Sequence, residues 1–434
     1  MSKYFKTAAA ALALVALAAP AMADSQISGY YRMQAMTDTV NGAPADNKKA
    51  ESQIDQRFRL RYQNNLNEYV HFVYFGEVDA PFGQQSKGNI GRGGKSSADG
   101  VNVETKNVYL DFKIPDSIFS FRIGTQGFGD NWQNVFVADD MSGVQANMAF
   151  TPALGTTLAY FKLDEGTTVI DGVNTSKYNW DDTDLYALKN KLKVNDNFAL
   201  NFDAYYLDDN SIDLDLYTLG LGADAKLGTV GLDGFIAYQT GTQEQAAPAA
   251  DIDVDAWVAS VKAKMDIGAA KTGLRLTYYS EDDSAQDDGS FGEIAAGAFQ
   301  FAGENLSIFY SDVFYNNTSS GRHAITDAAE AGYGLFAVNA TADFKFPSDY
   351  YLKTGAGYFM SLEDQVSLPT PAATALTKKQ GETLGFEVAA RVGTIVAKKV
   401  DVSLNGAYAF LGDFYDARSE ERRVGQECRY RWWP

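Results

Sequence analysis

Hydrophobic and polar residues alternate along much of this chain, most sharply between Gln56 and Tyr62. The charged positions there are Arg57, Arg59 and Arg61, and the apolar positions are Phe58, Leu60 and Tyr62. A period of two indicates a β-strand whose two faces meet different surroundings. Because an unpaired buried charge is very costly, three arginines on one face do not suit a protein core. They suit a strand with one face on a water-filled lumen and the other on lipid, so the pattern predicts a hairpin of a transmembrane β-barrel.

Similar runs follow one another along the chain and predict about 17 strands of roughly ten residues, the length of a membrane-crossing strand. Their connections alternate in length. Asn65–Glu68, Pro115–Ile118 and Pro347–Asp349 are short, whereas Thr37–Gln53 and Glu281–Gly334 are long. Short periplasmic turns alternating with longer outer loops are typical of bacterial outer-membrane barrels. The expected fold is therefore all-β, a transmembrane antiparallel β-barrel.

The expected number of strands is even, as in bacterial single-chain barrels. We expect about 18 in the parent protein, about 16 if two weak runs merge, and about 20 if Glu281–Gly334 adds a hairpin. The last strand is interpreted as missing here. RSEERRVGQEC, Arg418 to Cys428, resembles the translation of a sequencing adapter, so Arg418–Pro434 is interpreted as a foreign tail. The alternative is a genuine basic tail.

The N-terminus has the features of a secretory signal peptide. Lys3 and Lys6 precede an apolar run, and an A-x-A cleavage site, Ala21 to Ala23, precedes Asp24. The apolar run is too short for a transmembrane helix. We therefore expect residues 1–23 to be removed on export and Asp24–Ala417 to form the barrel.

Composition and charge narrow the possible functions. The chain has 13% aromatic residues and 39 glycines, which suit aromatic girdles and turns. Its net charge of −19 argues against a nucleic-acid binder and biases an aqueous channel towards cations. The single cysteine, Cys428, lies in the tail, so no disulfide framework is expected.

The chain resembles the large, channel-forming porins of Gram-negative outer membranes. The resemblance covers Asp24 to about Asp416 and rests on the hairpin pattern, the alternation of loop lengths and the ending LGFEVAARVG…LNGAYAFLGDFY. It implies a homotrimer in outer-membrane lipid and lipopolysaccharide. It also implies a third outer loop that folds inward as a constriction. In this chain that loop is Gly127–Asp140, with the acidic residues Asp130, Asp139 and Asp140.

The phase of each strand predicts which side chains face the aqueous side. The residues expected to line the pore are Arg32, Arg57, Arg59, Arg61, Glu77, Asp79, Asp111, Arg122, Lys189, Asp203, Lys262, Arg275, Glu387 and Arg391. The opposite, lipid-facing set is apolar and includes Leu200, Leu221, Leu384 and Phe386.

The arginines between Gln56 and Tyr62 have two interpretations. In one, they form the basic half of a constriction, and the acidic loop Gly127–Asp140 opposite them creates a transverse field that orients small polar solutes. In the other, they form a wall ladder that neighbouring carboxylates such as Glu77 and Asp111 neutralise. For Gly127–Asp140 the separate alternative is an ordinary surface loop.

Enzyme and metal chemistry find little support in the sequence. The only histidines are His71 and His323, which leaves little for a Ser–His hydrolase or a histidine-ligated metal. Acidic clusters such as Asp251, Asp253 and Asp255 lack the calcium-loop pattern. We therefore expect no metal, no cofactor and no enzymatic activity.

The pattern as a whole favours a passive diffusion channel for ions and small hydrophilic solutes, with a mild cation preference, in the outer membrane of a Gram-negative bacterium. The alternative is a structural barrel around a multihaem cytochrome in an electron conduit. Since the chain has no C-x-x-C-H motif, the haem would belong to a partner protein. A more remote alternative is an adhesive barrel that acts through its outer loops.

Overall fold

The computed structural model contains two compact units, both built from antiparallel strands. It describes residues 24–38, 51–83, 101, 103–166, 169–170, 173–174, 182–245, 248–282, 287–294, 300–301, 303–310, 324–363, 381–418 and 431–433. Unit 1 comprises Met1–Met33, Asp55–Gly127 and Asp140–Lys162, and unit 2 comprises Gln34–Ile54, Phe128–Asp139 and Leu163–Pro434. The predicted signal peptide lies outside the described residues.

Unit 1 consists of antiparallel strands, some of which continue for a few residues into unit 2. They are β1 (Asp24–Asp38), β2 (Glu51–Asn65), β3 (Val70–Pro81), β4 (Glu104–Lys113), β5 (Phe119–Gly129), β6 (Ala138–Thr151) and β7 (Leu154–Asp164). β3 pairs with β2 on one side and β4 on the other, β4 also pairs with β5, and β6 pairs with β7. Each strand thus bonds to the next one along the chain, as in a meander.

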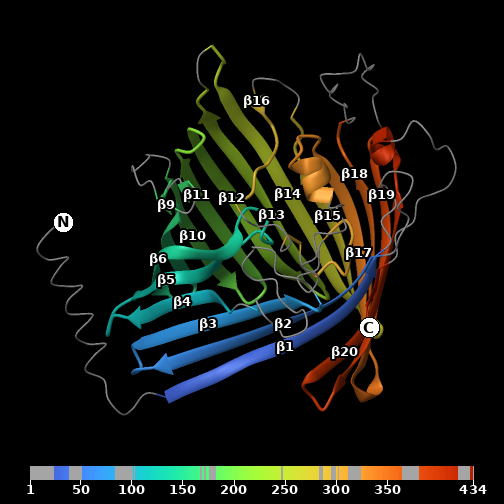
Figure 1. Cartoon of the computed structure of the whole chain (residues 1–434), viewed down its shortest axis with the longest axis horizontal. Helices are drawn as coiled ribbons and strands as arrows, with labels where there is room; N and C mark the ends of the chain where they lie inside the picture. The colour runs from blue at the N-terminus through green and yellow to red at the C-terminus, as the bar shows by residue number, and fades with distance from the viewer. Residues whose placement is uncertain are drawn as a thin grey trace, which may run out of the picture. The chain divides into compact units, whose positions relative to one another are not determined.

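Unit 2 continues the same hairpin order (Figure 1). Its long strands are β10 (Thr183–Asn195), β11 (Phe198–Asp209), β12 (Leu214–Leu227), β13 (Val230–Gln243), β14 (Ile252–Ile267), β15 (Ala270–Tyr279), β17 (Leu335–Lys345), β18 (Tyr350–Met360), β19 (Thr383–Val396) and β20 (Val400–Leu411). Each pairs antiparallel with the next, and β15 pairs directly with β17. Across the described residues there are 17 long strands, so the predicted all-β antiparallel fold is confirmed.

Short elements fill parts of the longer connections. β8 (Val169–Ile170) and β9 (Val173–Asn174) form a small hairpin, and β16 (Asp287–Asp288) pairs in parallel with β14. The helical turns are η3 (Ile325–Ala329), η4 (Pro347–Asp349) and η5 (Asp413–Arg418). Among the described residues, no helix has the length and hydrophobicity needed to cross a membrane. The hairpin considered for Glu281–Gly334 is not seen in the described part of that segment, which contains only β16 and η3.

The two faces of the strands have opposite polarity, and the apolar face is the exposed one. In unit 1, Phe58 is 42% exposed whereas its neighbour Arg57 is 8% exposed. In unit 2, Leu221 is 59% exposed whereas Asp203 and Glu387 are fully buried. A water-soluble protein buries its apolar side chains and exposes its charges, so this distribution is the reverse. It is the arrangement of a strand with lipid on one face, and in these residues it agrees with the predicted alternation.

One predicted lipid-facing residue, Leu384, lies on the wrong face. β18 and β19 pair Phe359 with Gly385 and Met360 with Thr383, so Leu384 has no partner and forms a β-bulge. Gly385 has a φ of 141°, which few residues other than glycine adopt. The extra residue reverses the alternation, and Leu384 is fully buried as a result.

The seam next to the predicted foreign tail is only partly paired. β21 (Arg431–Trp433) pairs with Asn405–Ala407 of β20 and with Thr37 and Asp38 of β1. Three residues cover little of the twelve-residue edge of β20. Among the described residues the rest of this edge has no partner strand, and an unpaired edge in lipid is costly.

Two connections of unit 2 return to the polar face of its strands. We call residues 130–137, between β5 and β6, the short insert. The described residues between β15 and β17 form the long insert, which includes η3, the orange helical turn in Figure 1. Their apolar side chains are buried, among them Trp132, Phe136, Phe309 and Ile325. Both inserts therefore have a packed core of their own against the polar wall.

Candidate functional site

The arginines of β2 form ion pairs with carboxylates of β3. The register places Arg57 opposite Asp79 and Arg59 opposite Glu77. Arg57 donates two hydrogen bonds to Asp79, Nε to Oδ1 at 2.7 Å and Nη2 to Oδ2 at 2.5 Å, and Arg59 donates to Glu77. Bidentate arginine–carboxylate pairs are strong and geometrically specific. The contacts agree with the neutralised wall ladder, the second interpretation of these arginines.

Arg61 differs from its two neighbours because it lies opposite Phe75 and has no ion pair among the described residues. Arg59 also lies over aromatic rings, 5.7 Å from the centre of Tyr30 and 5.9 Å from that of Phe75. On the neighbouring strand, Arg32 lies 3.6 Å from Asp55. The polar face of unit 1 therefore carries a row of paired charges. In the described part of β2, Arg61 is the arginine that has no ion-pair partner.

A second paired site lies on β4 and β5. Arg122 donates to both oxygens of Asp111, at 2.7 and 3.0 Å, and its guanidinium lies 4.4 Å from the centre of the Tyr109 ring. Asp111 and Arg122 are register partners, so the pair follows directly from the hairpin. Arg122 is thus neutralised in the same way as Arg57.

The predicted constriction loop Gly127–Asp140 is shorter than expected at both ends. β5 continues to Gly129 and β6 begins at Ala138, so Asp139 and Asp140 are strand residues. Asp140 contacts Lys106 and accepts a hydrogen bond from Asn107 at 2.6 Å. The sequence pattern missed this because acidic residues at a strand end look like loop residues.

Asp130, the remaining acid of that loop, binds the main chain of its own segment. Its carboxylate accepts hydrogen bonds from the N–H groups of Trp132 (2.6 Å), Asn134 (2.9 Å), Phe136 (2.8 Å) and Val137 (3.0 Å). Burial raises the pKa of Asp130 above its ordinary value, although the four N–H donors favour the charged form. Asp130 belongs to unit 2 and the arginine ladder to unit 1. A field between the two therefore stays a prediction.

The short insert is attached to the polar face of β11 and β12. Asp203 accepts hydrogen bonds from the main-chain N–H of Asn131 at 3.1 Å and from its side-chain amide at 2.7 Å. The Trp132 ring lies against Gly220, where any Cβ would approach the indole to 2.4 Å, and meets Tyr205 edge to face at 5.5 Å. Asp203, predicted to line the pore, is covered by this contact and holds the insert instead of facing water.

Lys189, another predicted lining residue, also contacts this region. Its ammonium donates to the carbonyl oxygen of Gly129, at the end of β5, and lies 4.9 Å from the centre of the Phe128 ring. Lys189 therefore supports the start of the short insert from β10.

The long insert is held by two carboxylates, one its own and one on the wall. Its Glu304 accepts hydrogen bonds at the same oxygen, Oε1, from Lys262 (2.8 Å) and Arg275 (2.7 Å). On the wall, Glu387 accepts from three successive main-chain N–H groups, those of residues 307, 308 and 309, at 2.7, 3.0 and 2.8 Å. Lys262, Arg275 and Glu387 thus lie on the predicted face, but the insert covers them.

The two inserts also contact each other. The N–H of Ile294 donates to the carbonyl of Phe136 at 2.6 Å, and that of Phe301 to the carbonyl of Gln133 at 3.1 Å. Phe136 and Phe291 meet edge to face at 6.3 Å. The inserts therefore form one inner layer on the polar face of unit 2. Sequence reasoning missed Trp132 and Glu304, for which the only signal was an apolar stretch within a polar loop.

Arg391 is the last predicted lining residue. Its guanidinium donates to the Tyr351 hydroxyl at 3.1 Å and to Asp401 at 3.1 Å. Unlike Arg275, it lies away from the contacts that hold the inserts, and it remains partly exposed. It is therefore a candidate for contact with solutes on the polar face of unit 2.

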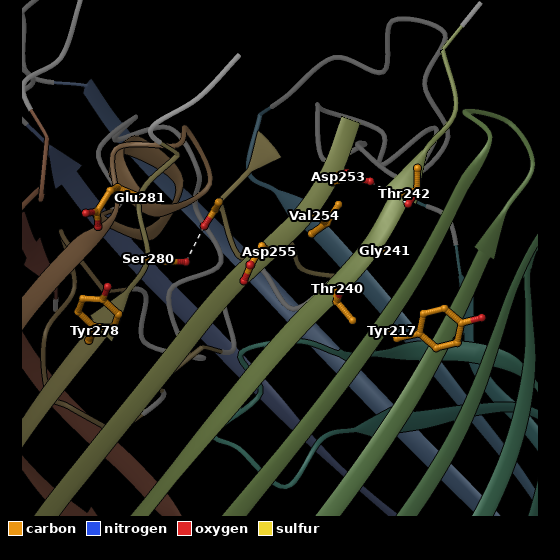
Figure 2. Close-up of a pocket in the computed structure, with 11 residues that line it drawn as sticks. Tyr217, Thr240, Gly241, Thr242, Asp253, Val254, Asp255, Tyr278, Ser280 and Glu281 are labelled. Carbon is orange, nitrogen blue, oxygen red and sulfur yellow. Dashed lines mark hydrogen bonds between the residues drawn. The ribbon is translucent and has the colours of Figure 1, made fainter. Parts of the chain in front are cut away.

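A surface cavity of about 850 Å³ lies where β12–β15 reach their long connections (Figure 2). Its lining includes the carboxylates of Asp253, Asp255 and Glu281 and the rings of Tyr217 and Tyr278. The two tyrosines are 48% and 39% exposed and share the apolar face with Leu219 and Leu276. The cavity therefore lies at the rim of the apolar face, and Glu281 and Gly289 of the long insert line part of it. In the described part of the chain, no group of three or more His, Cys, Asp or Glu residues is placed to hold a metal ion.

Comparison with known proteins gives matches only among solved structures, since no protein-family model and no curated protein matches the sequence. OccK8 (OprE) of Pseudomonas aeruginosa has 14% identity and a TM-score of 0.54, over 94% of this chain and 97% of that one. OccK2 (OpdF) of the same species, in complex with glucuronate, has 13% identity and a TM-score of 0.53, over 95% and 96%. A BenF-like porin from Pseudomonas fluorescens Pf-5 has 11% identity and a TM-score of 0.53, over 95% and 97%. At these identities the likeness shows the fold: this chain has the transmembrane β-barrel fold of Gram-negative outer-membrane porins, and the outer membrane is the location that this fold implies.

Proposed function

We propose that the chain is a passive diffusion channel for ions and small hydrophilic solutes across the outer membrane. The observation that carries this proposal is the reversed polarity of the strands, with the apolar face exposed and charged side chains on the other face. A channel wall needs this arrangement, because one side meets lipid and the other meets water. The glucuronate in the OccK2 complex is a solute of the class that we propose.

The narrow part of the channel is proposed to include the two inserts of unit 2. They occupy the polar face and are held there by Asp203, Glu304 and Glu387. A structural barrel for a multihaem cytochrome would need this face for its partner, so segments of the same chain on it favour the channel. The inserts restrict passage by size, and the charges around them determine which ions enter.

A mild preference for cations is part of the proposal. The chain carries a net charge of −19, and three of the arginines that would oppose cation entry, Arg57, Arg59 and Arg122, are paired with Asp79, Glu77 and Asp111. Paired charges contribute little to the electrostatic field at a distance. The field that an entering ion meets is therefore set mainly by the excess of acidic residues. Association as a homotrimer, in contact with lipid and lipopolysaccharide, completes the proposed assembly.

The test is conductance in a planar bilayer with a salt gradient. The original chain should be compared with a version in which Arg418–Pro434 is replaced by an alternating last strand ending in an aromatic residue. Stepwise conductance is expected, with a reversal potential on the cation-selective side. Circular dichroism of the same samples reports whether the β-structure is present. If both proteins are folded and inserted yet electrically silent, the channel proposal is wrong and the structural barrel is favoured.

A further inference from the structure

Two glycines of β18 allow the long insert to lie directly against the wall. A Cβ at Gly355 would lie 2.7 Å from the carbonyl oxygen of Asn305 and 2.8 Å from that of Glu304. A Cβ at Gly357 would lie 2.5 Å from the Asn339 amide nitrogen and 2.9 Å from Leu306. The atoms facing Gly355 belong to the main chain, so residues 304 and 305 fit there only because Gly355 has no side chain. The atoms facing Gly357 belong to side chains, which would have to shift to make room for a Cβ.

The wall around this contact presents charged side chains as well as the ring of Phe359. We call Lys262, Arg275, Asn339, Gly355 and Gly357 the seat. The side chains of Lys262 and Arg275 are 9% and 2% exposed, and both donate to Oε1 of Glu304, which is itself 2% exposed. The second oxygen of that carboxylate, Oε2, is buried and has no hydrogen-bond partner among the described residues.

Asn339 adds a second buried group without a partner. It lies on β17 directly opposite Arg275 on β15 and is fully buried. Neither its amide nitrogen nor its amide oxygen has a hydrogen-bond partner in the described part of the chain. Buried polar groups are almost always hydrogen-bonded, and buried water molecules typically make about three bonds to groups of this kind. The Asn339 amide and the second oxygen of Glu304 are groups of this kind, and both belong to the contact between the seat and the long insert.

We propose that the long insert is a displaceable plug, docked on the seat by the ion pairs of Glu304 and by ordered water molecules at Asn339, and that its release opens the channel further. The inference rests on the proposed channel function. A contact made of ions, amides and water exchanges easily for contacts with the aqueous lumen, because each group finds equivalent partners there. An apolar contact would lose its stabilisation on exposure to the same lumen. Residues 307–309 stay attached to Glu387 while residues 304–306 leave the seat.

The first experiment locks the plug with a disulfide bond. Asn305 and Asp343 are both replaced by cysteine in the full chain carrying Cys428→Ser, and single channels are recorded before and after addition of a reductant. The side chain of Asn305 donates to the carboxylate of Asp343 on β17 at 2.8 Å, so the two side chains face each other. The oxidised protein is expected to lose its high-conductance intervals, which the reductant restores. Identical recordings in both states would overturn the proposal.

The second experiment tests the water in the seat and needs no cross-link. If water bridges Asn339, then Asn339→Leu removes a bonded group and raises the time spent in the high-conductance state by about fivefold, the effect of one lost hydrogen bond. If the seat holds no water, Asn339→Leu removes an amide that has no partner and lowers the time spent in the high-conductance state. This result would overturn the proposal. Gly355→Ala should also raise it, whereas Gly231→Ala is the matched control because its nearest neighbours lie 3.9 Å away.

The same recordings separate the plug from the channel itself. A folded protein that conducts nothing contradicts the channel function. A protein that conducts at one unchanging level, in the original chain and in the Gly355→Ala variant alike, contradicts only the plug.

Discussion

Gly220 on β12 is a position where one added methyl group should displace the short insert. A Cβ there would lie 2.4, 2.6 and 2.8 Å from three atoms of the Trp132 indole, which is fully buried and packs against Tyr205. The ring therefore has to move. Overpacking of this kind costs about 1–3 kcal/mol. At 1.4 kcal/mol per tenfold, the ratio of docked to undocked insert should fall by roughly 5- to 150-fold.

Two measurements report this displacement. Single-channel conductance should rise in Gly220→Ala, because the short insert no longer occupies the polar face. Iodide quenching of Trp132 should rise as well, measured in vesicles in a background where the other four tryptophans are phenylalanine. Gly231→Ala on the neighbouring strand controls for the loss of a strand glycine, since its Cβ would have only ordinary contacts.

These two measurements can refute the role of the contact between Trp132 and Gly220. If Gly220→Ala and Gly231→Ala match the original chain in both conductance and quenching, then the contact between Trp132 and Gly220 does not hold the short insert. A rise in quenching without a rise in conductance would mean that the insert is attached as described but does not narrow the channel.

Three further changes test other parts of the structure. Replacing Arg57, Arg59 and Arg61 by serine should shift the reversal potential towards cations, because the carboxylates that two of them neutralise become unpaired; an unchanged potential would remove these arginines from the narrow part. The docking of the short insert should weaken as the pH rises, because burial raises the pKa of Asp130, so the folded protein binds its proton more tightly than the unfolded chain. Stability is then greatest below the usual aspartate pKa of about 3.9 and falls as the pH rises through the raised value. Protease cleavage of the insert against pH measures this, and the same trend in Asp130→Asn would assign it to another group. Finally, Leu221→Arg on the exposed apolar face should cost about 2–4 kcal/mol of unfolding free energy in vesicles, measured by denaturant titration, and a cost near zero would mean that this face does not meet lipid.

The strands and their faces were predictable from the sequence because each depends on local information. Alternation places Arg57 and Phe58 on opposite faces, and the short turn after Asn65 sets the register that puts Arg57 opposite Asp79. The neutralised ladder follows from that register. Alternation assigned Leu384 to the wrong face. One unpaired residue at a bulge reverses the alternation, and the hydrophobic pattern of the sequence does not show where a bulge lies.

The inserts were not predictable in the same way, because their attachments join residues far apart in the chain. Asn131 reaches Asp203 across 72 positions, and Glu304 reaches Lys262 across 42. A carboxylate such as Asp130 looks the same in the sequence whether it faces water or binds the main chain. Which wall residues a returning loop covers is known only from the fold. The sequence therefore predicted that Asp203, Arg275 and Glu387 lie on the polar face, but it did not predict that the inserts bury them.

Asp130 and Glu387 hold their segments through peptide N–H groups, which every residue except proline supplies. Substitutions at the partly exposed positions 133, 134 and 307 therefore leave these attachments intact as long as proline is avoided. Selection can then vary the surface that passing solutes meet while each segment keeps its position. The same freedom makes these positions natural places to engineer a new permeability.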